Sequence, residues 1–150
     1  MITKQEFESI LADTSKRIEG DIVWHSSKDG SPVHEFRVTV ESNTGWPLIV
    51  VGKYNPLAGT LSYAVLHRLA GRIYSLDLGA DHHNPNCQRV GEKHKHRWSE
   101  EYRDKIAYVA SDISATWDQP VAVWMEFCQE AGITHQGVMR CPAVQGDLPL

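Results

Sequence analysis

The alternation of apolar and polar residues divides the chain into a first helix, a run of strands and a last helix. Apolar residues recur at helical spacing from Thr3 to about Glu19, which predicts an amphipathic helix. Thr3 and Glu6 have the spacing of a capping box, in which each side chain satisfies an unpaired backbone donor of the other residue. Gly20 is expected to end this helix, because glycine readily adopts the left-handed conformation found after helix C-termini.

The middle of the chain has the period-two alternation that is typical of strands. Phe36, Val38 and Val40 alternate with polar residues, which predicts one buried and one exposed face. The Asp29-Gly30 dipeptide is a strong hairpin signal between two such segments. The segments expected to form strands are 21–26, 32–41, 47–51, 60–69, 72–78 and 93–98. Most of their connections are short, and short connections favour antiparallel pairing.

A second helix is predicted near the C-terminus. Asp118 is expected to cap it, Pro120 fits its first turn, and Gly132 is expected to end it. Its expected apolar face consists of Val121, Trp124, Met125 and Cys128. The sequence therefore predicts a single α+β domain over residues 1–150, with an irregular tail from residue 141. In this fold, an antiparallel sheet of about five or six strands has the N-terminal and C-terminal helices packed on one face.

Composition narrows the class of protein further. The chain has 150 residues and a formal charge of −4 with neutral histidines, so a nucleic-acid partner would need a local basic patch. We expect no membrane partner, because no stretch approaches the roughly 20 apolar residues of a membrane span, and the N-terminus lacks the apolar core of a signal peptide. The odd number of cysteines (Cys87, Cys128 and Cys141) leaves at least one unpaired, which favours a cytoplasmic location.

The residues most typical of chemistry lie in a histidine-rich segment. Four of the eight histidines fall between residues 82 and 96, namely His82, His83, His94 and His96. Residues 87–97 also carry four basic side chains and one acidic side chain, a local reversal of the overall charge. Period-two alternation puts His94, His96 and Trp98 on one face of the predicted strand, and Lys93, Lys95 and Arg97 on the other.

Two neighbouring imidazoles can divide the roles of general acid and general base near neutral pH. We therefore expect a small ribonuclease or phosphodiesterase, such as a toxin-type module, that uses His94 and His96 without a cofactor. Its partner would be RNA or another nucleic acid. Side chains of Arg89, Lys95 and Arg97 are expected to bind phosphate, and Asp77 or Asp104 to orient an imidazole. Tyr102 is expected to line the same cleft if the chain folds back.

Two alternatives remain open at this stage. His94-X-His96 on a strand, together with His82 or His83, could instead bind a transition metal such as zinc. The protein could also be a non-catalytic binding module, of a kind found in phages and mobile elements, that grips a protein or nucleic-acid partner through the basic segment. Exposed strand edges would additionally favour a homodimer.

Four ordered blocks in the second half of the chain carry a family resemblance. They are Tyr74-Ser75-Leu76-Asp77, His82-His83-Asn84-Pro85-Asn86, His94-Lys95-His96-Arg97-Trp98 and the segment from Tyr102 to Tyr108. This order resembles an uncharacterised bacterial family, a domain of unknown function, over about residues 72–133. The resemblance implies that the functional residues are Asp77, His82, Asn84, His94, His96, Tyr102 and Asp104. Cys87 stands where that family has glycine, which argues against Cys87 as an essential metal ligand.

Overall fold

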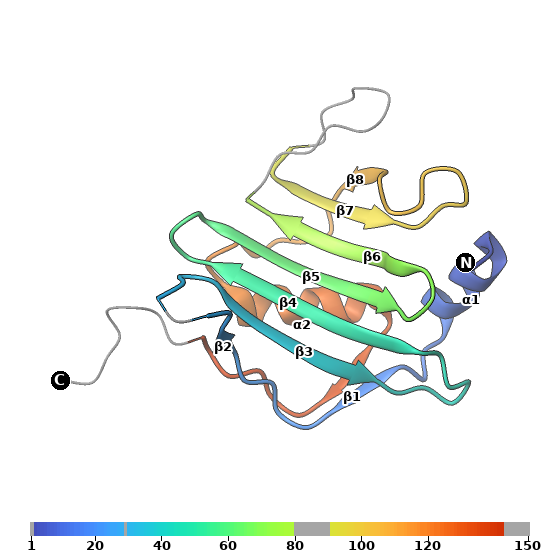
Figure 1. The fold of residues 1–150 in the computed structure, drawn as a ribbon, viewed down its shortest axis with the longest axis horizontal. Coiled ribbons are helices and arrows are strands. Elements are labelled where there is room, and N and C mark those ends of the chain that lie inside the picture. Colours follow the sequence, from blue (N-terminus) through green and yellow to red (C-terminus); the bar gives the residue numbers. More distant parts are fainter. Residues whose placement is uncertain (1, 29, 80–90, 143–150) are drawn as a thin grey trace.

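The computed structural model describes residues 2–28, 30–79 and 91–142 (Figure 1). The helices are α1 (Lys4–Ala12) and α2 (Pro120–Ala131). The strands are β1 (Arg17–Glu19), β2 (His25–Ser26), β3 (His34–Val40), β4 (Leu48–Asn55), β5 (Thr60–His67), β6 (Gly71–Leu78), β7 (Lys93–Arg97), β8 (Ala107–Val109) and β9 (Thr134–Gln136).

Strands β2 to β8 form one antiparallel sheet in which every strand lies beside its neighbours in the chain. The predicted α+β class, with an antiparallel sheet, an N-terminal helix and a C-terminal helix, is confirmed. The expected count of five or six strands was too low. This sheet has seven strands, and β1 pairs separately with β9 in parallel. Strands β1, β8 and β9 have three residues each, too few for their alternation to stand out in the sequence.

The two faces of the sheet have different roles. One face carries Tyr63 and Tyr74, which pack against Phe127 of α2 with ring centroids 5.5 and 5.8 Å away. Figure 1 shows α2 behind the sheet, so the opposite face, here called the front face, is turned toward the viewer. One row across the front face is fixed by register, since Lys53 pairs with Ser62, Ser62 with Asp77, and Asp77 with His94.

The first helix is shorter than predicted. The capping box of Thr3 and Glu6 is present as expected, but α1 ends at Ala12, and Asp13 has an extended conformation. Ile18 is buried in β1 rather than on the helix, and β1 pairs with β9. The predicted helix was too long because Ile18 fits the apolar spacing of a helix as well as that of a strand.

The second helix has the predicted end but a different start and buried face. Its N-cap is Gln119, whereas the carboxylate of Asp118 accepts a hydrogen bond from Thr116. Met125 is 68% exposed. The buried residues are Pro120, Val123, Trp124, Phe127, Cys128 and Ala131, so the buried stripe has the helical period but is rotated away from Val121 and Met125 toward Val123 and Phe127. Neither helix of the described part of the chain is long and apolar enough to cross a membrane.

Candidate metal centre

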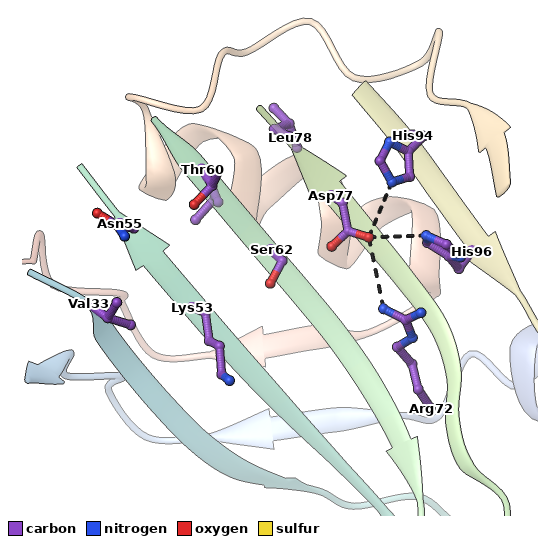
Figure 2. Close-up of a pocket in the computed structure, with 11 residues that line it drawn as sticks. Val33, Lys53, Asn55, Thr60, Ser62, Arg72, Asp77, Leu78, His94 and His96 are labelled. Carbon is purple, nitrogen blue, oxygen red and sulfur yellow. Dashed lines mark ion pairs between the residues drawn. The ribbon is translucent and has the colours of Figure 1, made fainter. Parts of the chain in front are cut away.

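Asp77, His94 and His96 converge on the front face of the sheet. The Nε2 atoms of His94 and His96 lie 3.4 and 3.3 Å from the same atom, Oδ2 of Asp77 (Figure 2). The arrangement follows from strand geometry. Asp77 on β6 pairs directly with His94 on β7, and the two-residue spacing of His94 and His96 puts both rings on one face. The ligand atoms of the three residues all lie within 4.8 Å of one another.

Backbone carbonyls hold both imidazole rings in place. His94 Nδ1 lies 3.0 Å from the carbonyl oxygen of Gly91, and His96 Nδ1 lies 2.7 Å from that of Asp104. A carbonyl oxygen can only accept a hydrogen bond, so each Nδ1 must carry the proton. In a neutral imidazole, the Nε2 lone pair is then directed at Asp77. This is the tautomer and orientation in which histidine binds metal ions in proteins.

The Asp77 carboxylate is ionised in this setting. Burial by itself raises the pKa of Asp77, but with both rings protonated the hydrogen bonds and charge from His94 and His96 outweigh burial and hold its pKa well below the usual value. A metal ion among the three ligand atoms would favour the ionised carboxylate in the same way. Its side chain is only 19% exposed, and those of His94 and His96 are 3% and 4% exposed. The cluster therefore combines one anionic oxygen and two imidazole nitrogens in a largely dehydrated position.

A β-bulge brings Arg72 to the same face. Val65 pairs with Tyr74 and Leu66 pairs with Arg72, so Ile73 is an extra residue on β6. Arg72 and Asp77 are five positions apart and would lie on opposite faces of a regular strand. The bulge removes this mismatch, and Arg72 NH1 lies 3.9 Å from Asp77 Oδ2.

Asp104 connects Arg72 to the cluster. Its carboxylate accepts a hydrogen bond of 2.7 Å from Arg72 Nε, and its backbone carbonyl accepts the Nδ1 proton of His96. One residue thus fixes both an imidazole and a guanidinium. Asp104, which was expected to orient an imidazole, contacts His96 through its backbone carbonyl rather than its carboxylate.

A cavity of about 510 Å³ on the front face is lined by Arg72, Asp77, His94 and His96. Residues of β4 and β5 complete its walls, among them Lys53, Asn55, Thr60 and Ser62. Figure 2 shows Ser62 between Lys53 and Asp77 on the middle strand, with the guanidinium of Arg72 pointing toward the Asp77 carboxylate. The volume lies within the range of small-molecule sites.

Several residues expected at the site do not take part in this arrangement. Lys95 and Arg97 lie on the face that packs against α2, where Lys95 pairs with Asp112 and Glu130, and Arg97 with Glu130. Tyr102 is 40% exposed in a turn and does not line the cavity. The structure therefore separates the basic side chains of β7 from its histidines.

Other expected residues lie outside the described residues, namely His82, His83, Asn84, Cys87 and Arg89. Of the remaining cysteines, Cys128 is free and buried and Cys141 is free and exposed. The sequence analysis missed Arg72, Lys53 and Ser62. The predicted strand 47–51 ended two residues before Lys53, whereas β4 continues to Asn55. The bulge that turns Arg72 to the front face has no signal in the alternation pattern.

The fold and the cluster define an α+β protein with a two-histidine, one-carboxylate cluster in a pocket on an antiparallel sheet. The chain belongs to DUF6978, a family of unknown function whose model matches residues 2–133. The expected membership of a family without an assigned function is thereby confirmed, over a longer part of the chain than the resemblance covered. No curated protein and no solved structure matches the chain.

Proposed function

We propose that the protein is a metal-dependent hydrolase whose metal ion is bound by Asp77, His94 and His96. The observation that carries the proposal is the convergence of two Nε2 atoms on one carboxylate oxygen while both Nδ1 atoms donate to carbonyls. Two neutral imidazoles in this orientation direct lone pairs at an anion. Positive charge is therefore needed between these three atoms, either as protons on both Nε2 atoms or as a metal ion.

The two nitrogen–oxygen distances favour a metal ion. Charge-assisted hydrogen bonds between nitrogen and a carboxylate are roughly 2.7–2.9 Å long, shorter than the 3.3 and 3.4 Å found here. Ligand atoms at the corners of a tetrahedron around zinc, with bonds of about 2.0–2.1 Å, are roughly 3.3 Å apart.

Three protein ligands leave a position for substrate or water, as in catalytic zinc sites. Zinc at this position would supply Lewis acidity and make a bound water more acidic. In the hydrolysis, the water oxygen bonds to the electrophilic atom of the substrate, the bond to the leaving group breaks, and the leaving group takes up a proton of the water. Iron(II) uses the same ligand set, so the metal content has to be determined for both ions.

The geometry gives less support to the other two hypotheses. A metal-independent ribonuclease needs one imidazole as base and one as acid on two sides of a phosphate, whereas both Nε2 atoms here face one carboxylate. A binding module that uses the basic segment needs accessible cations, whereas Lys95 is buried and engaged in ion pairs with Asp112 and Glu130.

The proposal predicts that the purified chain binds one zinc ion. After treatment with a chelator and dialysis against zinc chloride, we expect close to one zinc per chain by elemental analysis. Asp77→Asn keeps the shape of the side chain but removes its charge, and we expect it to weaken zinc binding by roughly 100-fold. His94→Ala and His96→Ala should do the same.

The matched control is His34→Ala, because His34 is another buried strand histidine but lies outside the cluster. It should keep full zinc content. Circular dichroism tests whether each variant is folded. If a histidine variant is unfolded, the zinc content of Asp77→Asn tests the metal centre in its place. Equal zinc content in folded wild type, Asp77→Asn and His34→Ala would show that any bound ion lies elsewhere and would refute the metal centre.

A further inference from the structure

The wall of the cavity beside the metal cluster carries two cationic side chains and a hydroxyl group. Lys53, Ser62 and Asp77 are consecutive positions in one row across β4, β5 and β6. Adjacent strands are about 4.8 Å apart, so Lys53 lies roughly two strand spacings from Asp77. Within the part of the chain that the structure describes, the Lys53 ammonium has no hydrogen bond or ion pair.

Arg72 is positioned to bind a ligand rather than to neutralise Asp77. Its Nε donates to Asp104 at 2.7 Å, which fixes the plane of the guanidinium, while NH1 is 3.9 Å from Asp77, too far for a hydrogen bond. The side chain is 34% exposed and lines the cavity. The terminal nitrogens can therefore donate to an anionic group in the cavity, and a guanidinium suits bidentate contact with phosphate or carboxylate oxygens.

Building on the proposed metal centre, we propose that the substrate is a small phosphate monoester whose phosphoryl group binds between Arg72, Lys53 and Ser62. A phosphate monoester carries a charge of about −1.5 to −2 near neutral pH. With zinc bound, the two cations Arg72 and Lys53 and the two carboxylates Asp77 and Asp104 leave a net charge of about +2, which matches a phosphate monoester. A carboxylate carries one charge and would match only half of it. The cavity of about 510 Å³ suits a small molecule, and the net charge of −4 provides no general attraction for a polyanion.

The corresponding reaction is balanced without an oxidant or reductant. Water oxygen bonds to phosphorus, the ester bond between phosphorus and oxygen breaks, and the released alcohol takes up a proton. The products are an alcohol and inorganic phosphate. Inorganic phosphate is therefore a suitable probe, since it contains the part of the substrate that this subsite would recognise.

Isothermal titration of the zinc-loaded full chain with inorganic phosphate tests the subsite. Arg72→Gln and Lys53→Gln each remove one cation, and we expect each to weaken phosphate binding by roughly tenfold or more, as loss of a charge-assisted hydrogen bond does. Zinc content should stay unchanged in both. Arg37→Gln is the matched control, because Arg37 lies on the same face but does not line this cavity, and it should bind phosphate like the wild type.

Three outcomes would overturn the phosphate subsite. The first is failure of phosphate to bind the zinc-loaded chain, and the second is phosphate binding by Arg72→Gln and Lys53→Gln at wild-type affinity. The third is binding of acetate as tightly as phosphate. Each would leave the metal centre intact, because zinc content is measured separately. If the chain binds no zinc but binds phosphate in an Arg72-dependent way, the metal centre is refuted and the anion subsite is supported.

Discussion

Alternation along β7 assigns neighbouring residues to different tasks. His94 and His96 face the cavity, whereas Lys95 points to the α2 side, where its ammonium lies 2.7 Å from Asp112 and 2.8 Å from Glu130. Burial raises the pKa of Asp112, but the hydrogen bond from Lys95 contributes to a net lowering. The charge of Lys95 therefore stabilises the folded state through ion pairs, although the sequence suggested that Lys95 binds phosphate.

This assignment predicts the effect of Lys95→Met. The substitution removes the cation beside Asp112 and one of the two cations beside Glu130, which keeps Arg97, so we expect the free energy of unfolding to fall by about 1–3 kcal/mol. Zinc and phosphate affinity of the folded variant should be unchanged. Urea denaturation and titration calorimetry measure the two properties. A loss of phosphate affinity at unchanged stability would instead support the original phosphate-binding role of Lys95.

At the scale of elements, the end of α1 depends on a buried lysine that the helical pattern did not reveal. Lys16 Nζ donates to the carbonyl oxygens of Ile10 and Leu11 at 2.5 and 2.9 Å, which satisfies the C-terminus of the helix. Burial lowers the pKa of Lys16 to about 8, while Asp13 opposes this shift. A side chain that reads as an exposed helical lysine in the sequence is therefore part of the interior.

The lowered pKa makes a prediction about stability and pH. Between about pH 8 and 10.5, the folded chain has lost the Lys16 proton and the unfolded chain still binds it, so stability rises with pH in this window. Lys16→Met should be less stable than the wild type, and the difference should grow from pH 8 to 10.5. Lys28→Met, an exposed control, should show no such trend. The free energy of unfolding is measured by urea denaturation at each pH. A difference between wild type and Lys16→Met that stays constant or shrinks from pH 8 to 10.5 would contradict the lowered pKa of Lys16.

The elements that could be predicted are those with a clear local signal. Each of these signals involves residues that are close together in the sequence, so local rules are enough to predict it. The signals are the capping box, the glycine after α2 and the alternation along β3, β5 and β6. Strands β1 and β9 stabilise each other only through a parallel pairing of segments more than a hundred residues apart. No local pattern contains that information, and the helix prediction therefore continued across β1.

At the scale of the whole molecule, the sequence indicated which segment carries the site but not which residues from other strands meet there. The spacing of His94 and His96 predicted a shared face, and Asp77 was expected nearby. The pairing of Asp77 with His94 depends on how the segment between β6 and β7 closes, and its length leaves the register open. Arg72 required a bulge, and Lys53 required β4 to continue past Gly52.

The most direct test of the account is an anomalous difference map from crystals of the zinc-loaded chain, collected on both sides of the zinc absorption edge. We predict one strong peak about 2.0–2.1 Å from Nε2 of His94, Nε2 of His96 and Oδ2 of Asp77. The peak should be missing in crystals of Asp77→Asn grown and soaked in the same way. A map of the wild type without a peak among these three atoms, or with zinc bound only at other residues, would contradict the metal centre.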